Sequence, residues 1–301
     1  MRMFRTILVP LDGSELAEQA LPLAEHLAMA TGAELELVRV HVPPTAWDIY
    51  ADAMTAGPAV HDTAPAEAAY LEEQARRARG TGLTVNATLL EGEVAPAIAR
   101  RARAVADLIV MTTHGRGPFS RLWLGSVADE LLRSLAQPML VVRPTMEAWA
   151  VASSPPYRRI LVPLDGTDGS EAALEPALAL GAPDITEYVL VRVLNVPVPA
   201  LAVPVPMAVE TEPTELEEAR AAEQLETVAA GLRVRGFKAR VCVEVRGGAA
   251  EGILAAAERE APDVIALATR APGRVERMLL GSVADKVVRA AHEPVLVVPA
   301  K

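Results

Sequence analysis

The chain alternates between two patterns of hydrophobic residues. Short apolar runs, such as residues 7–11, are followed by longer segments in which apolar side chains recur every three or four positions. A short continuous run is typical of a buried strand, and the wider spacing is typical of a helix with one apolar face. Because strands alternate with helices, the pattern predicts parallel sheets with right-handed crossovers and helices on both faces.

The same order of elements is expected twice. In the first half we expect strands at 5–12, 34–42, 83–90, 108–113 and 139–142, and helices at 14–31, 66–79, 93–104 and 126–136. In the second half we expect strands at 160–164, 189–194, 238–245, 264–269 and 295–298, and helices at 170–180, 213–230, 249–260 and 282–291. Five strands in each half predict an α/β fold of two doubly wound domains.

Repeated sequence supports this division. Val-Pro-Leu-Asp-Gly occurs at 9–13 and 162–166, and Leu-Gly-Ser-Val-Ala-Asp occurs at 124–129 and 280–285. Repeats in the same order indicate a tandem duplication. In a chain of 301 residues we therefore expect a first domain at 1–144, a linker at 145–157 and a second domain at 158–301.

Composition and charge narrow the class of protein. Hydrophobic residues make up 51% of the chain but aromatic residues only 3%, so aliphatic side chains must fill the cores. The net charge of −10 repels nucleic acid and anionic membranes over most of the surface, so neither is expected as a partner. The apolar run at 7–11 is too short for the core of a signal peptide, and a cytoplasmic location is expected.

Two long loops interrupt the regular pattern, at about 43–65 and 196–213. Either loop can pack on its own domain, or it can form a lid or a partner surface. The second is apolar over most of its length. Its four prolines exclude a membrane helix, because each proline removes a backbone donor.

Residues that often build metal or nucleophilic sites are sparse. Cys242, the single cysteine, lies in an alternating strand pattern that favours a buried or half-buried thiol over a nucleophile. The five histidines lack the spacing of metal ligands. No Walker-type lysine follows a glycine-rich loop, and we expect His114 to shape its loop rather than to act as a base. We therefore assign no catalytic residue and no metal held by side chains alone.

Ligands of doubly wound sheets bind beyond the carboxyl ends of the strands. At this edge Asp12 could accept hydrogen bonds from ribose hydroxyls, or it could form an Asp-Gly turn. Ser126 and Asp129 have the spacing of a capping box, which would be structural. Alternatively, Gly115, Gly125 and the amides near Ser126 form a cradle for an anion at the start of a helix.

The two Val-Pro-Leu-Asp-Gly openings, Gly115 followed by Gly125-Ser126, and the closing Pro-x-Leu-Val-Val strands resemble the universal stress protein family in its tandem two-domain form. The resemblance implies a Rossmann-like five-stranded parallel sheet in each domain, with the two fifth strands pairing edge to edge. Nucleotide-binding members carry Gly-x-x-Gly, nine residues, then Gly-Ser or Gly-Thr, and the ligand is usually ATP. Here Thr112 replaces the first glycine of that pattern.

The resemblance also implies which residues contact ATP. The positions carried over are Pro10, Leu11, Asp12, Val40 and Met111 for adenine and ribose, Thr112 in place of the first glycine, and Gly115, Arg116, Gly125, Ser126 and Val127 for the phosphates. Magnesium or manganese would accompany the phosphates.

The second copy keeps only part of this set. Its matching positions are Pro163, Leu164, Asp165, Val193, Gly281, Ser282 and Val283. The two loop glycines become Ala268 and Ala271, and alanine at positive φ costs about 1–2 kcal/mol. Pro272 also restricts Ala271 to extended conformations. Three arginines could contact phosphate instead, or could be solvated surface residues: Arg270, Arg274 and Arg277. Binding is therefore expected mainly in the first domain.

Three functional hypotheses follow. The first is a cytoplasmic protein of stress response or signalling that binds ATP mainly through its first domain. The second is a regulatory or adaptor protein of the same fold that works without nucleotide, and the third is a slow ATPase. The fifth strands are expected to pair within one chain, although a swap between chains or a homodimer would also cover their edges.

Overall fold

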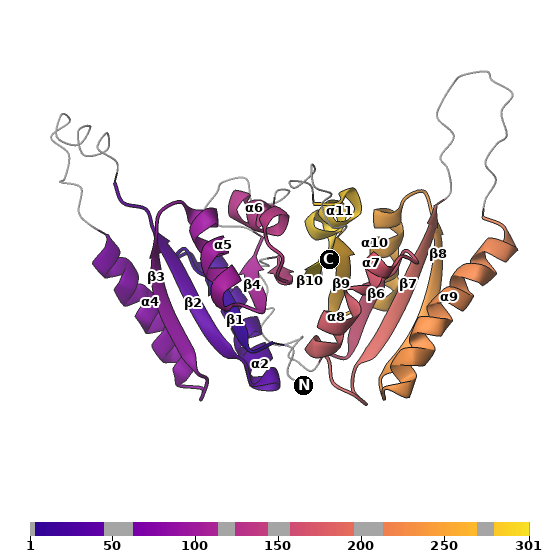
Figure 1. Ribbon diagram of the computed structural model, residues 1–301, viewed down its shortest axis with the longest axis horizontal. Coiled ribbons are helices and arrows are strands. Elements are labelled where there is room, and N and C mark those ends of the chain that lie inside the picture. The colour runs from indigo at the N-terminus through magenta and orange to yellow at the C-terminus, as the bar shows by residue number, and fades with distance from the viewer. Residues whose placement is uncertain are drawn as a thin grey trace, which may run out of the picture. The chain divides into compact units, whose positions relative to one another are not determined.

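The computed structural model describes residues 4–44, 63–113, 124–143, 157–195, 213–269 and 280–300. Contacts divide the chain into two compact units. The first contains Met1–Gln137 and Pro144–Met146, and the second contains Pro138–Arg143 and Glu147–Lys301. Each unit combines strands with helices that pack against them (Figure 1).

In the first unit the structure describes four parallel strands. They are β1 (Thr6–Pro10), β2 (Glu34–His41), β3 (Val85–Glu91) and β4 (Leu108–Thr112), in the order β3-β2-β1-β4. Strands β1 and β4 are the most completely buried, since all residues of β4 and the middle three of β1 are buried. This burial explains why these strands appear in the sequence as continuous apolar runs.

Helices cover the first sheet on both faces. They are α1 (Glu15–Glu18), α2 (Ala20–Thr31), α4 (Ala64–Arg79), α5 (Val94–Val105) and α6 (Ser126–Ser134). Right-handed crossovers place α2 and α4 on one face and α5 and α6 on the other, where α5 and α6 contact each other. The segment expected as one helix at 14–31 is two helices that meet at Gln19. Ser14 caps α1 by accepting from the amide of Ala17 at 3.2 Å, as its position predicts.

In the second unit the structure describes six strands. They are β5 (Met139–Val142), β6 (Arg159–Pro163), β7 (Glu187–Asn195), β8 (Lys238–Arg246), β9 (Val264–Thr269) and β10 (Val295–Pro299), in the order β5-β10-β9-β6-β7-β8. Among these described strands only β5 runs antiparallel to its neighbour, with Val141 opposite Val295. Thus β5, which the repeat assigns to the first copy, belongs by its contacts to the second unit.

The helices of the second unit repeat the pattern of the first. They are α7 (Asp168–Glu171), α8 (Leu174–Leu180), α9 (Glu215–Val234), α10 (Ala249–Glu260) and α11 (Ser282–Ala290). Thr214 and Glu217 form a capping box at the start of α9. The α/β fold with mostly parallel sheets is therefore confirmed. Within the described ranges no helix is long and apolar enough to cross a membrane.

Candidate functional site

The carboxyl ends of three strands meet at one edge of the first sheet. Strand β1 pairs in parallel with both β2 and β4. The chain therefore brings Asp12, Val40 and Thr112 to the same edge. The predicted contacts differ in exposure: Asp12 is exposed, Pro10 and Val40 are half-buried, and Leu11, Met111 and Thr112 are buried.

Asp12 forms the turn that follows β1. Its Oδ1 accepts hydrogen bonds from the amide of Ser14 at 2.8 Å and from the Ser14 hydroxyl at 2.5 Å. Gly13 takes φ = +80° within this turn, a conformation that favours glycine. The turn interpretation of Asp12 is thus confirmed. Oδ2 makes no hydrogen bond to the described part of the chain, so this oxygen can still accept from a ribose hydroxyl.

Helix α6 begins differently from the capping-box interpretation. Gly125 is the N-cap residue and Ser126 is the first helical residue, with no side-chain cap. The Asp129 carboxylate instead accepts from Arg133 one turn later, at 2.8 and 3.0 Å. The capping-box interpretation is wrong because Ser126 lies one position too far into the helix for its hydroxyl to cap it.

The backbone amides at this helix start fall into two groups with different roles. The Gly125 amide donates to the carbonyl of Thr113 at 2.6 Å, which ties α6 to the end of β4. The amides of Ser126 and Val127 lie in the first helical turn, where no intrahelical acceptor exists. Ser126 is exposed and Val127 is half-buried. The positive end of the helix dipole and these amides can therefore hold an anion.

Two of the predicted phosphate contacts lie outside the residues that the structure describes. Gly115 and Arg116 lie outside the described residues, as do His114 and the second-copy loop positions Ala271 and Pro272. The described part of the predicted cradle consists of Gly125, Ser126 and Val127 at the start of the helix and Thr112 at the end of the strand.

The second domain repeats the turn after its first strand. Asp165 Oδ1 accepts from the amide of Thr167 at 3.0 Å and from its hydroxyl at 2.5 Å. Burial raises the pKa of Asp165, but the hydrogen bonds from Thr167 and Ser170, together with nearby Arg192, outweigh burial and hold it below its usual value. Pro163 is half-buried and Leu164 is buried, as in the first copy.

The other second-copy positions are only partly equivalent. Val193 on β7 packs against α10, where a Cβ on Gly252 would lie 2.5 Å from a Val193 methyl. Gly281 caps α11 with φ = −53°, and a Cβ added there would meet no protein atom within 4 Å. Folding therefore does not require glycine at 281, whereas a ligand approaching Ser282 and Val283 would benefit from the open space.

The two copies differ at the end of the fourth strand. In the second copy the carbonyl of Thr269 accepts from the amide of Ala300 at 2.9 Å, and no hydrogen bond joins it to Gly281. The position equivalent to Ala300 in the first copy is Pro144, which has no amide hydrogen. The link that ties the N-cap glycine to the strand end therefore exists in the first copy alone.

A charged cluster beside Val40 was not predicted from the sequence. Glu67 on α4 contacts Arg39 at 3.3 Å and His41 Nδ1 at 2.9 Å. Burial raises the pKa of Glu67, but the hydrogen bond from His41 and the charge of Arg39 lower it more. These residues are far apart in sequence, and no local pattern signals that α4 places a carboxylate over the end of β2.

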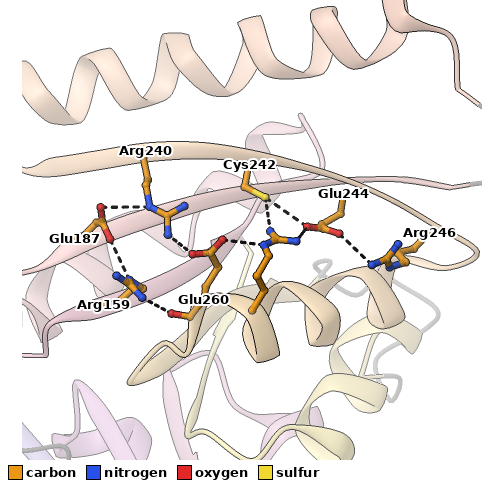
Figure 2. Close-up of polar contacts among 8 residues, drawn as sticks. Arg159, Glu187, Arg240, Cys242, Glu244, Arg246 and Glu260 are labelled. Atoms are coloured by element: carbon orange, nitrogen blue, oxygen red, sulfur yellow. Dashed lines mark hydrogen bonds and ion pairs between the residues drawn. The ribbon is translucent and has the colours of Figure 1, made fainter.

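A second charged cluster surrounds Cys242 on β8 (Figure 2). Arg240 pairs with Glu187 and Glu260, and Arg259 from α10 pairs with Glu244 and donates to the Cys242 sulfur at 2.9 Å. Burial raises the pKa of the thiol more strongly than Arg259 lowers it. The thiol is half-buried in a strand, as predicted, and its environment favours the unreactive protonated form. Among the residues that can be described, no histidine, cysteine or acidic cluster could hold a metal ion.

Comparison with known proteins agrees with this architecture. The model of the universal stress protein family matches the chain twice, over residues 3–143 and 156–299. The chain belongs to the universal stress protein family. A universal stress protein of Mycolicibacterium smegmatis is 27% identical and matches across 97% of this chain and 96% of its own length. One from Thermus aquaticus is 34% identical over 47% of this chain and its entire own length.

The fold is also found among solved universal stress proteins. One from Archaeoglobus fulgidus superimposes with a TM-score of 0.71, covering 98% of both chains at 20% identity. That similarity extends over both copies, so this universal stress protein has the tandem arrangement expected from its internal repeat.

Proposed function

We propose that this universal stress protein binds ATP mainly in its first domain, residues 1–144, and acts in the cytoplasm in stress response or signalling. The observation that carries the proposal is the start of α6. There Gly125 is tied to β4, and the Ser126 and Val127 amides point out of the helix without intrahelical acceptors. This arrangement supports binding of an anionic group such as phosphate.

The neighbouring strand ends complement that anion site. Pro10 and Val40 offer half-buried apolar surface for a base next to buried Leu11, and Asp12 keeps one carboxylate oxygen that can accept from ribose. A site with apolar surface, one carboxylate and a helix N-terminus suits the three parts of a nucleotide. Magnesium or manganese would bind through the phosphates, because the described residues supply no metal cluster.

Thermal unfolding with and without ATP and magnesium tests the proposal. ATP at about 100 times its dissociation constant should stabilise the protein by about 2.7 kcal/mol. Small molecules released by denaturing protein that was purified without added nucleotide should include an adenine nucleotide. Absence of both results would refute ATP binding and would favour the nucleotide-independent adaptor.

Two matched variants assign the site to a domain. Gly125 and Gly281 both have backbone angles that any residue adopts, with φ of −59° and −53°. Valine at either position should therefore fold but should obstruct the adjacent helix start. We expect Gly125→Val to lose most ATP binding in calorimetric titration and Gly281→Val to retain it. Equal losses would show that both copies bind.

We also propose that the β5–β10 pairing joins the two domains within one chain. The antiparallel register from Val141 opposite Val295 to Met139 opposite Val297 supports this arrangement. A homodimer could form in addition through other surfaces.

A further inference from the structure

Two arginines occupy the same position in the two copies. In the first sheet Pro10 lies opposite Val38, and in the second Pro163 lies opposite Val191. The next residues along β2 and β7 are Arg39 and Arg192. Each arginine therefore lies in the second half of its strand, toward the edge of the sheet at which the nucleotide is expected.

In the first domain Arg39 is held against helix α4. Its Nη2 lies 3.3 Å from Glu67 Oε1, and its guanidinium lies 5.3 Å from the centre of the Tyr70 ring. Only 15% of the Arg39 side chain is exposed. The ion pair and the ring together hold this guanidinium against α4.

The second domain lacks both partners. Arg79 and Arg233 each donate Nε at 2.9 Å to the carbonyl of the following strand, at Val85 and Ala239 respectively, which aligns α4 with α9. Counting back from these arginines, Ala221 takes the place of Glu67 and Gln224 takes the place of Tyr70. Ala221 is buried with 4% of its surface exposed. No carboxylate on α9 therefore holds Arg192 in the way that Glu67 holds Arg39.

Arg192 turns toward the loop after β6 instead. Its guanidinium packs on Gly166 so closely that a Cβ at that position would collide with Nη1, and Gly166 has φ = +79°. Asp165 immediately precedes this glycine, and Arg192 contributes to lowering the Asp165 pKa. Across the described ranges no hydrogen bond or ion pair to Arg192 is formed. A guanidinium with unused donors thus lies beside the expected ribose position.

We propose that Arg192 makes the second domain a site for an adenine nucleotide that carries a phosphate on the 3′-hydroxyl of its ribose. An acidic residue at the strand end accepts from free ribose hydroxyls, whereas a neighbouring arginine accommodates a ribose phosphate. Arginine suits this role because its planar fork donates two parallel hydrogen bonds to phosphate. The inference rests on the proposed function, since it assumes that both domains use the same edge of their sheets.

The other end of the second site agrees with this preference. Ala268 stands where the first copy has Thr112, and the Thr269 carbonyl is occupied by the amide of Ala300 rather than by that of Gly281. The cradle for phosphates on the 5′ side has therefore changed. The second domain therefore combines an altered 5′-phosphate region with an added cation at the ribose. The first domain keeps its 5′-phosphate region, and its equivalent arginine is held by a carboxylate.

Two isomers of AMP test the proposal. 3′-AMP and 5′-AMP have the same composition and differ only in which ribose oxygen carries the phosphate. Binding is measured by calorimetric titration of the Gly125→Val protein, in which the first site is obstructed. We expect 3′-AMP to bind at least about tenfold more tightly than 5′-AMP, the effect of one or two charged hydrogen bonds.

Two variants examine the role of Arg192 in this background. Arg192→Gln removes the charge from a partly exposed side chain. Ala221→Glu keeps the arginine but supplies the carboxylate that restrains its counterpart in the first domain. Both should abolish the preference for 3′-AMP while preserving the circular dichroism spectrum. The proposal is overturned if the isomers bind equally, if neither binds, or if Arg192→Gln retains the preference. If Ala221→Glu does not fold, Arg192→Gln alone decides.

The experiment separates this inference from ATP binding. If the native protein binds ATP through its first domain but the Gly125→Val protein shows no preference for 3′-AMP, the proposed function stands and this inference fails. If ATP does not bind but an Arg192-dependent preference for 3′-AMP is measured, this inference stands and the proposed function fails.

Discussion

Two buried tyrosines differ in what their hydroxyl groups contact. Tyr157 is 1% exposed, and its hydroxyl has no hydrogen-bond partner among the described residues. Tyr188 is fully buried, and its hydroxyl donates to the carbonyl of Leu178 at 3.3 Å. A buried polar group without a partner costs free energy, whereas a bonded one contributes a modest amount.

We therefore expect opposite results from removing the two hydroxyls. Tyr157→Phe should raise the free energy of unfolding by about 1 kcal/mol, and Tyr188→Phe should lower it by about 1 kcal/mol. Urea denaturation followed by circular dichroism measures both. A larger loss of stability in Tyr157→Phe than in Tyr188→Phe would show that the Tyr157 hydroxyl has a partner in solution.

At the residue scale, local motifs were predicted better than contacts between elements. The turn formed by Asp12 and the cap formed by Ser14 depend on residues close in sequence, and the structure contains both. The capping role of Ser126 failed by one position, because the helix begins at that residue rather than after it. The contact of Arg39 with Glu67 was not predicted, because the packing of α4 on β2 brings them together.

Helices α4 and α9 are equivalent elements that start differently. The Thr214 hydroxyl accepts from the amide of Glu217 at 3.3 Å, and the Glu217 carboxylate accepts from the Thr214 amide at 2.8 Å. Thr63 occupies the same position before α4, but its side chain makes no cap hydrogen bond. Only α9 therefore has its first amides satisfied by a capping box.

Replacing the two cap residues should change the stability of the protein by different amounts. Thr214→Ala should lower the free energy of unfolding by about 1 kcal/mol, because it exposes an unpaired amide at the helix start. Thr63→Ala should change stability by less than about 0.5 kcal/mol. Thermal unfolding of the two variants provides the measurement. Equal losses would mean that the capping box does not stabilise α9 in solution.

At the element scale, hydrophobic spacing predicted the order of strands and helices but missed where helices break. The first helix of each copy divides into two, at Gln19 and at residues 172–173. Pro22 and Pro176 then fall in the first turns of α2 and α8. The missing amide hydrogen of proline breaks no intrahelical hydrogen bond there. These prolines could have indicated the breaks, whereas apolar spacing continues across them.

The β5–β10 pair concerns the whole molecule. Its three residue pairs are antiparallel, unlike the other strand pairs described in the second unit. Val141→Pro should disrupt this pairing, because proline removes a backbone donor and does not fit a central strand. If the pair joins the domains, calorimetry should resolve two unfolding transitions in the variant and one in the native protein.

Val141→Ala is the matched control for that change. It shortens the same buried side chain but keeps the amide, so we expect a lower melting temperature with a single transition. A single transition in Val141→Pro as well would show that the strand pair does not couple the two domains.

The β5–β10 pair also has a consequence for synthesis on the ribosome. Val141 pairs with Val295, so most of the second repeat must be translated before β5 can meet its partner. During that interval the emerging first repeat carries an uncovered strand edge, and such edges recruit strands from other chains. Slow translation through the second repeat would lengthen this exposure and would favour association with strands of other chains.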